Sequence, residues 1–343
     1  QWFLPALIEN AKVLMMMGKW TEAQDTALRV LGSDERNVEA LRFVVFHLLA
    51  REGQYQNAQK KLQQLVELIS RHEPKNAALF FNVARTVARL AGREQGCLQL
   101  SLRMARHARQ LQPQNSEYAS EVGEQLLLLE QVAEASKSFR DATQLDESNM
   151  EAHYGIIKCQ ILEGNLEDAE QQLEFLNEIS MSVGSNAALT HLSSMIKWAK
   201  DKNKSRSVSL LQETVELHVE GLEGLEMGYG YFTALDPALL VQIAKEFLQH
   251  CPTEPIAAGE DHDPTIDRAI EVLEIVLKDV PGLVEAQLLL AKTKYITNDL
   301  DGAQKQIMQC LQLNPHYSEA NVILAQIYLS GDQYKDAMGA LDQ

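Results

Sequence analysis

Apolar side chains recur at every third or fourth position along almost the whole chain. This spacing places them on one face of an α-helix, so the pattern predicts helices rather than strands. Short turns that contain glycine, asparagine or aspartate separate the apolar runs. The sequence contains no run of 18 or more apolar residues, which is the length that a transmembrane helix needs. We therefore expect an all-α protein with no membrane-spanning helix.

The helical pattern repeats with a period of about 34 residues. Each repeat holds one helical run, a short turn and a second run with an alanine near its start. About nine units are expected, the last of them cut short, beginning near residues 4, 38, 77, 116, 150, 187, 236, 284 and 318. This is the period of the tetratricopeptide repeat. The predicted fold is a right-handed superhelical solenoid of antiparallel helix pairs.

Small residues and prolines recur at fixed places in the repeat. A small residue in each helix lets its partner come close, a larger one fills the groove between repeats, and proline ends the second helix. Gly18, Gly53, Gly164 and Asn298 stand in the turns, where a tight connection requires a backbone that these residues adopt readily. The predicted structural positions are Ala11, Ala23, Ala84, Gly123, Ala135, Phe139, Ala169, Ala269, Pro281, Ala291, Ala303, Pro315, Ala325 and Ala337.

The repeats are expected to form one continuous solenoid. Residues 1–218 hold about six units, and residues 219–343 hold about three more. The seventh unit is the most disturbed, because a proline-containing insertion near residues 251–265 separates its two helices. The chain starts without methionine and stops within an apparent helix, so we expect it to be part of a longer polypeptide.

Composition narrows the classes of function. The net charge of −17 argues against nucleic acid or an anionic membrane as the main partner, since phosphate contacts require clustered Lys and Arg. A local basic patch stays possible. The cysteines lie far apart, and we expect buried, reduced thiols of an intracellular protein rather than disulfides or metal ligands. They are Cys97, Cys159, Cys251 and Cys310.

The usual motifs of catalysis are missing from the sequence, including the GxxxxGK[ST] phosphate loop, GxSxG and HExxH. We therefore expect no enzymatic activity, no cofactor and no small-molecule substrate. One group in the insertion resembles a set of metal ligands: His250, Cys251, Asp261, His262 and Asp263. A structural zinc site brings two close ligand pairs, and this group lacks them. It is expected to interrupt the repeat rather than to bind a metal.

Isolated aromatic and histidine side chains are expected to have structural roles. His107, His153 and His191 lie on helical runs without a carboxylate or thiol at ligand spacing, so packing or solvent-edge roles are expected. Trp20 follows the run MMMGK. We expect it to lie in the turn of the first unit and to pack against the helices of that unit.

Some segments go beyond a generic repeat. They are the helix that ends in CPTEP (251–255), the turn VPGL (280–283), and LNP (313–315) followed by AQIYL (325–329). Together with MGKWTEAQDTALRVL and HEPKN nearer the start of the chain, they resemble the tetratricopeptide repeat protein 21 family. The likeness spans most of the chain.

The resemblance implies a non-enzymatic protein–protein interaction scaffold, the all-repeat subunit of intraflagellar transport complex A. This complex supports retrograde ciliary transport and the entry of membrane proteins into cilia. The implied partners are other complex A subunits, built of repeats or propellers, with no nucleic acid, membrane insertion or small-molecule substrate. The implied locations are the cilium or flagellum, the basal body and the cytoplasm.

The alternative is a peptide-binding co-chaperone or an adaptor of another large assembly. A co-chaperone that grips an acidic C-terminus needs Lys, Arg and Asn repeated on its first helices, facing the groove. Here Glu, Ala, Gln, Leu and Ser stand at those positions in most units. The pattern therefore favours the scaffold.

Overall fold

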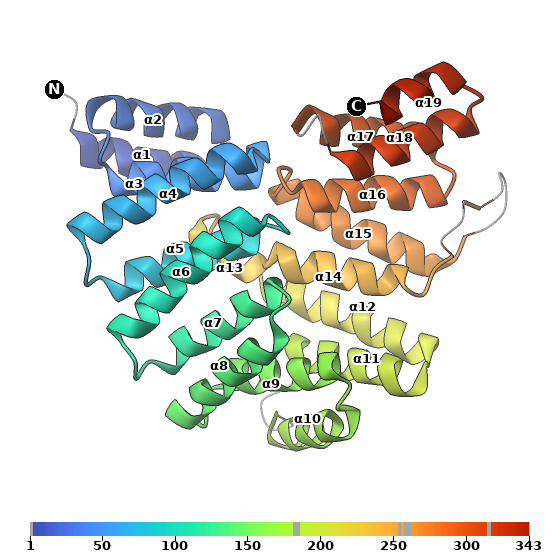
Figure 1. Ribbon diagram of the computed structural model, residues 1–343, viewed down its shortest axis with the longest axis horizontal. Helices are drawn as coiled ribbons and strands as arrows, with labels where there is room; N and C mark the ends of the chain where they lie inside the picture. The colour runs from blue at the N-terminus through green and yellow to red at the C-terminus, as the bar shows by residue number, and fades with distance from the viewer. Residues whose placement is uncertain (1–2, 181–185, 253–254, 257–261, 314–316, 343) are drawn as a thin grey trace. The chain divides into compact units, whose positions relative to one another are not determined.

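Helices make up nearly all of the structure (Figure 1). The computed structural model describes residues 3–180, 186–252, 255–256, 262–313 and 317–342, and within these ranges it holds helices, turns and loops but no strand. The prediction of an all-α fold built of helix pairs is confirmed. Over the same ranges, no helix has both the length and the apolar content that crossing a bilayer requires.

The helices follow one another as pairs joined by short turns. The first helices are α1 (Leu4–Met16), α3 (Val38–His47), α5 (Ala77–Leu90), α7 (Ser116–Leu128), α9 (Met150–Glu163), α11 (Ala187–Asp201), α14 (Pro237–Leu248), α16 (Val284–Ile296) and α18 (Ser318–Ser330). The second helices are α2 (Trp20–Ser33), α4 (Tyr55–His72), α6 (Gln95–Leu111), α8 (Val132–Leu145), α10 (Leu166–Ser180), α12 (Lys204–Glu220), α15 (Pro264–Asp279), α17 (Leu300–Leu313) and α19 (Tyr334–Leu341). Each first helix begins within one residue of the start that the repeat gives.

Two further elements have no counterpart in the repeat pattern. A π-helical turn, η1 (Leu48–Glu52), follows α3 directly, and a short helix, α13 (Tyr229–Leu235), lies in the glycine-bearing stretch after α12. A π-turn widens a helix by one residue and is frequent at functional sites. The sequence analysis predicted neither element.

The chain divides into two compact units. The first contains residues 1–47 and 56–235, with the pairs from α1 to α12 and helix α13. The second contains residues 48–55 and 236–343, with η1 and the pairs from α14 to α19. The single continuous solenoid stays a prediction.

Asparagine starts most of the first helices in the first unit. The residue before each of these helices accepts a hydrogen bond at its side-chain oxygen from a backbone N–H in the first helical turn. Such a cap stabilises a helix by about 1 kcal/mol. The capping residues are Asn37, Asn76, Asn115, Asn149 and Asn186.

The turns have the backbone that the sequence predicted. Gly18, Gly53, Gly164 and Asn298 have φ angles of 71°, 61°, 83° and 61°. Glycine adopts this left-handed region without steric cost, and asparagine tolerates it better than most residues. The predicted role of these four residues in the turns is therefore confirmed.

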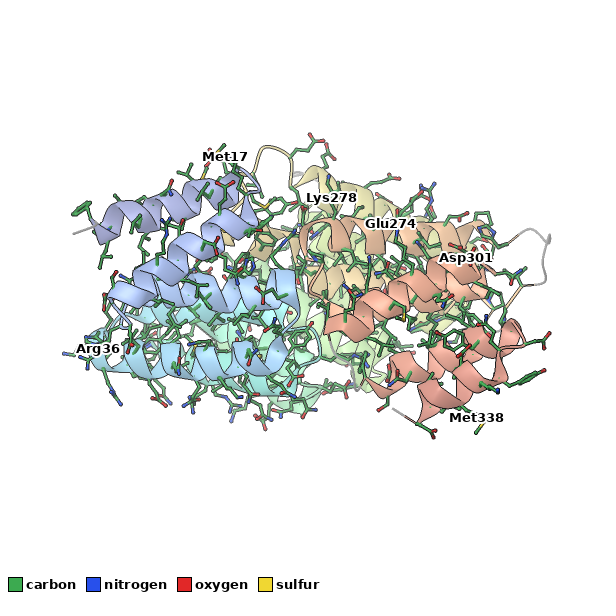
Figure 2. The ribbon with its side chains drawn as sticks, turned by 90° about the horizontal axis from the view of Figure 1, so that it is seen from above. Met17, Arg36, Glu274, Lys278, Asp301 and Met338 are labelled. Carbon is green, nitrogen blue, oxygen red and sulfur yellow. The ribbon has the colours of Figure 1, made fainter. Side chains whose placement is uncertain are left out.

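Polar side chains cover the outer surfaces of the helices. In the second unit, Glu274 and Lys278 on α15 and Asp301 on α17 are exposed and project from their helices (Figure 2). Inside, small residues such as Ala135 and Ala169 are buried in the core. Phe139 on α8 is fully buried, and a Cβ atom placed on Gly123 of α7 would lie 2.7 Å from its ring.

Candidate interaction surfaces

Charged side chains connect three consecutive first helices of the first unit. Arg85 on α5 lies 3.2 Å from Glu117 and 3.7 Å from Glu121, both on α7, and 3.4 Å from Glu151 on α9. Arg89, one turn after Arg85, lies 3.2 Å from Glu121. We call these five residues the charged ladder.

The pair at the centre of the ladder is buried. The side chains of Arg89 and Glu121 are 9% and 4% exposed, and Glu121 also accepts a hydrogen bond from the Gln125 amide at 2.8 Å. A buried charge without its partner costs several kilocalories per mole, so each of these groups depends on the other. The ladder therefore ties α5 to α7, and its arginines are neutralised by carboxylates of the same chain.

Helix α13 contributes aromatic rings to a cluster in the first unit. Phe232 is fully buried, and its ring centroid lies 4.8 Å from that of Phe46 on α3 and 5.9 Å from that of Trp20. The ring of Tyr229 lies 5.3 Å from Phe46, with the guanidinium of Arg42 4.0 Å from the Tyr229 centroid. Burial raises the pKa of Tyr229 well above its usual range.

The prediction for Trp20 named only the first unit, and the structure adds ring contacts outside that unit. Trp20 is the first residue of α2, and its ring contacts Phe46 on the next pair and Phe232 on α13. The repeat pattern contains only neighbouring helices, so it gave no sign that a segment two hundred residues later supplies the partner ring. The aromatic spacing of Tyr229 and Phe232, three residues apart, was the available signal.

In the second unit, η1 and the turn after α15 are in backbone contact. A Cβ atom on Gly53 would lie 2.6 Å from the carbonyl oxygen of Gly282, and one on Gly282 would lie 2.6 Å from Gly53 N and from Leu49 O. Such distances exclude any side chain at either position. We call this the glycine contact.

Hydrogen bonds surround the glycine contact. The N–H of Gly282 donates to the carbonyl of Ala50 at 2.9 Å, and Arg51 donates to the carbonyl of the last residue of α15 at 3.0 Å. The hydroxyl of Tyr55 donates to the Gly282 carbonyl and accepts from the N–H of Val284, both at 3.2 Å. The VPGL turn is thus held by η1 and by the residues just after it.

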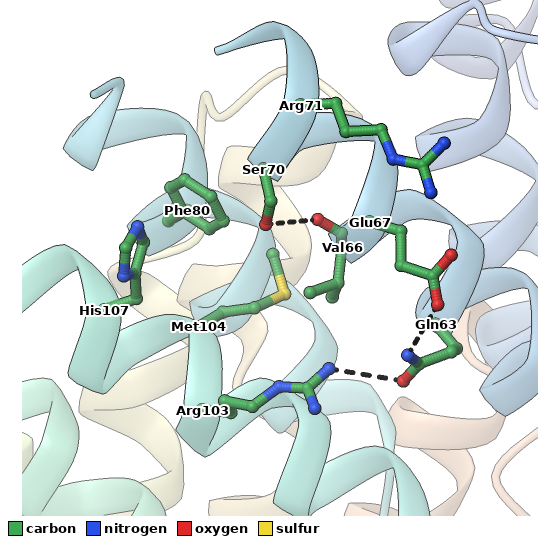
Figure 3. Close-up of a pocket in the computed structure, with 9 residues that line it drawn as sticks. All are labelled: Gln63, Val66, Glu67, Ser70, Arg71, Phe80, Arg103, Met104 and His107. Atoms are coloured by element: carbon green, nitrogen blue, oxygen red, sulfur yellow. Dashed lines mark hydrogen bonds between the residues drawn. The ribbon is translucent and has the colours of Figure 1, made fainter. Parts of the chain in front are cut away.

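A cleft of about 430 Å³ lies between α4 and α6 in the first unit (Figure 3). Val66, Phe80 and Met104 are its buried apolar lining, and its exposed charged side chains are Glu67, Arg71 and Arg103. We call it the α4–α6 cleft.

One predicted histidine also lines the α4–α6 cleft. His107 packs edge-on against Phe80 with 4.6 Å between the ring centroids, so its predicted packing role is confirmed.

The metal-like group in the insertion has other contacts. Cys251 is buried, and its thiol donates to the carbonyl one turn earlier in α14 at 3.4 Å. Asp263 caps α15, and His262 lies 2.8 Å from Asp267. Asp261 lies outside the described residues. Within the ranges that the structure covers, no three possible ligands gather at one point.

The four cysteines are buried free thiols, as predicted. Burial raises the pKa of Cys97, Cys159 and Cys310 to about 12. A thiol with this pKa holds its proton at neutral pH, and the thiolate is the reactive form. These three side chains pack in the core.

Comparison with known proteins places the chain in a family. The profile described as the tetratricopeptide repeat protein 21 second ARM domain matches residues 60–332. The chain belongs to the tetratricopeptide repeat protein 21 family. Human tetratricopeptide repeat protein 21B is 40% identical over 97% of this chain, and mouse tetratricopeptide repeat protein 21A is 33% identical over 96%. The chain spans a quarter of the length of each of these relatives (25%).

The structure also resembles a solved repeat protein. The crystal structure of yeast Tom70 aligns with a TM-score of 0.50 and 16% identity, over 93% of this chain and 59% of that one. At this identity the similarity shows the fold alone. The predicted tetratricopeptide-repeat solenoid and the resemblance to the protein 21 family are both confirmed.

The structural positions predicted for this member of the protein 21 family are mostly in the core. Pro281 is half-buried in the VPGL turn, and Pro315 lies outside the described residues. The packing roles assigned to these positions stay predictions. The buried positions are Ala11, Ala23, Ala84, Gly123, Ala135, Phe139, Ala169, Ala269, Ala291, Ala303, Ala325 and Ala337.

Proposed function

We propose that this stretch of a tetratricopeptide repeat protein 21 is a protein–protein interaction scaffold within intraflagellar transport complex A. In this role it supports retrograde ciliary transport and the entry of membrane proteins into cilia. Membership of the family, through the match over residues 60–332, is the observation that carries the proposal. The location that follows is the cilium or flagellum, the basal body and the cytoplasm.

The arrangement of the described side chains supports a structural role. The arginines of the charged ladder are paired with carboxylates, and the three buried thiols with raised pKa hold their protons. Stacks of helix pairs expose long lateral surfaces that suit binding to other proteins. The proposed partners are the repeat and propeller subunits of complex A, and the proposal includes one continuous solenoid over residues 1–218 and 219–343.

The charged ladder also bears on the co-chaperone alternative. A carboxylate clamp needs free cations on the first helices, as a charge-assisted hydrogen bond to the ligand requires an unpaired donor. Arg85 and Arg89 stand on the first helix α5, but Glu117 and Glu121 on α7 already engage them. This favours the scaffold over the clamp.

Affinity capture from ciliated cells tests the proposal. The full-length protein, tagged and expressed at its native level, is isolated together with its bound proteins, and the bound proteins are quantified by mass spectrometry. We expect complex A subunits in a constant ratio to the tagged protein. A tagged co-chaperone with tetratricopeptide repeats is the control. Recovery of chaperones in place of complex A subunits would contradict the proposal.

A further inference from the structure

The region around α4, α5 and α6 has a net positive charge, whereas the whole chain has a net negative charge. Residues 60–110 contain ten Lys and Arg residues and three Glu residues, whereas the whole chain has 31 Lys and Arg against 48 Asp and Glu. Helix α6 itself has three arginines and no acidic residue. A local excess of positive charge attracts an acidic partner and speeds its association.

Two cations that line the α4–α6 cleft have no carboxylate partner. Arg71 makes no ion pair with any residue that the structure describes. Arg103 donates to the neutral side-chain oxygen of Gln63 at 3.2 Å, while the Gln63 amide donates to Glu67 at 2.9 Å (Figure 3). The cleft thus holds two arginines and one carboxylate, that of Glu67, which accepts from Gln63, so its net charge is positive and attracts an acidic ligand.

The neighbouring cleft on the same side of the first unit differs in this respect. Between α6 and α8, Arg106 lies 3.0 Å from Glu134 and Arg109 lies 2.7 Å from Asp141. The arginines there are neutralised by the chain itself. The α4–α6 cleft differs, because Arg71 and Arg103 form no ion pair with the residues that the structure describes.

The apolar residues of the cleft indicate which class of ligand it can bind. Val66, Phe80 and Met104 line the same cleft as the two arginines, so a ligand that combines a carboxylate with a neighbouring apolar side chain fits both features. About 430 Å³ lies at the small end of the usual range of ligand pockets, which suits one or two side chains of a bound segment. Single-stranded nucleic acid needs exposed aromatic rings for stacking, and Phe80 is 1% exposed.

We propose that the α4–α6 cleft binds an acidic segment of a partner protein, with its carboxylates on Arg71 and Arg103 and an apolar side chain over Phe80 and Met104. This inference deepens the proposed scaffold role, because it names one binding surface and the kind of segment that it receives. Its evidence is the cleft itself, and it does not depend on which assembly supplies the segment.

Fluorescence anisotropy with the purified 343-residue chain tests the proposal. The probe is a fluorescein-labelled peptide of sequence EDELFEDE, and a matched peptide QNQLFQNQ lacks the charges. We expect the acidic peptide to bind with Kd below about 1 mM at low salt and the neutral peptide to bind at least about tenfold more weakly. A peptide EDESSEDE, without the apolar pair, should bind more weakly than EDELFEDE.

Two variants with the same change of charge separate the cleft from general attraction. Arg71→Glu with Arg103→Glu should weaken binding of EDELFEDE by about tenfold or more, because two charge-assisted contacts become repulsive. Lys137→Glu with Arg140→Glu, on the exposed side of α8, should change it less than about threefold. Circular dichroism checks that both variants stay helical. If the first one unfolds, Arg71→Gln with Arg103→Gln replaces it.

Three results would overturn the proposal. They are no binding of EDELFEDE, an equal loss of binding in the two variants, and tighter binding of a ten-nucleotide oligo(dT) that depends on Arg71 and Arg103. The last result would assign the cleft to nucleic acid. The peptide assay uses only purified protein and peptides, so a failure to bind peptide does not affect the capture of complex A subunits. A failure to capture complex A subunits likewise does not affect the peptide result.

Discussion

Gly53 and Gly282 are far apart in the sequence, yet their backbones touch. A Cβ atom on either residue would lie 2.6 Å from a main-chain atom of the other. The contact joins η1, inserted after α3, to the VPGL turn between α15 and α16. Each residue is a glycine because the opposing main chain occupies the place of a side chain.

Replacing Gly282 by alanine should destabilise the second unit. The new Cβ would meet the main chain near Gly53 and Leu49, and overpacking of this kind costs about 1–3 kcal/mol. Denaturant unfolding and hydrogen exchange of the amides at 48–54 and 280–284 measure the effect. The control is Gly32→Ala in α2, where no atom lies within 4 Å and helix propensity favours alanine by about 1 kcal/mol. Unchanged exchange in the Gly282 variant would contradict the contact.

Removing the carboxylate of Glu121 should be far more harmful than removing an exposed one. Glu121→Ala removes one side of the buried ion pair with Arg89, and breaking such a pair costs about 3–5 kcal/mol. The matched control is Glu134→Ala, whose pair with Arg106 is 64% and 49% exposed and worth at most about 1 kcal/mol. Urea unfolding followed by circular dichroism measures both. Similar losses for the two variants would show that the ladder does not stabilise the fold.

A side chain at Gly155 on α9 should clash with the ring of Phe139. A Cβ atom there would lie even closer to the ring than one on Gly123. We expect Gly155→Val to destabilise the first unit by about 1–3 kcal/mol through overpacking. Phe139→Leu, which shortens the opposing side chain, should restore part of this loss in the double variant. A double-mutant cycle measures the coupling, and additive effects would mean that the two side chains do not compete for space.

The buried thiols should make stability fall at alkaline pH. In the folded state the pKa of Cys97, Cys159 and Cys310 rises from 9.0 to about 12, so above pH 9 the unfolded chain releases protons that the folded chain keeps. The free energy of unfolding is then unaffected by these groups below pH 9 and decreases between pH 9 and 12. Urea unfolding at pH 7.5 and 10 measures this.

Tyrosines also titrate between pH 9 and 12, so a control is needed to isolate the contribution of the thiols. The control variant replaces Cys97, Cys159 and Cys310 by alanine. That variant should show a smaller decrease between the two pH values. In the native protein at pH 8, we also expect Ellman's reagent to react with these thiols only as fast as the chain unfolds. Rapid reaction of three equivalents would contradict the burial of the thiols.

The local structure could be predicted from the sequence because each repeat has its own signals. The period gave the start of every first helix to within one residue, and Gly18 and Asn298 marked turns through the backbone that they adopt. Asparagines such as Asn76 and Asn115 also cap these helices at nearly the repeat spacing. These features depend on residues that lie next to one another in the chain.

Contacts between distant segments could not be predicted in this way. The docking of α13 on Trp20 and the glycine contact join parts of the chain that no periodicity relates. The charged ladder left only part of a signal, since Glu117 and Glu151 are each the second residue of their helices whereas Arg85 is the ninth residue of α5. The sequence carries only a partial signal of the α4–α6 cleft. Residues 60–110 have an excess of Lys and Arg, but the sequence does not reveal which of these cations form ion pairs.

Quantitative cross-linking of assembled complex A tests the scaffold role most directly. The full-length protein, alone and in the purified complex, is treated with an amine-reactive cross-linker, and the reactivity of exposed lysines such as Lys60 and Lys75 is compared. We predict cross-links from this stretch to other complex A subunits and lower lysine reactivity in the assembled state. A complex in which these lysines stay as reactive as in the free protein, with no cross-link from residues 1–343 to another subunit, would contradict the scaffold role.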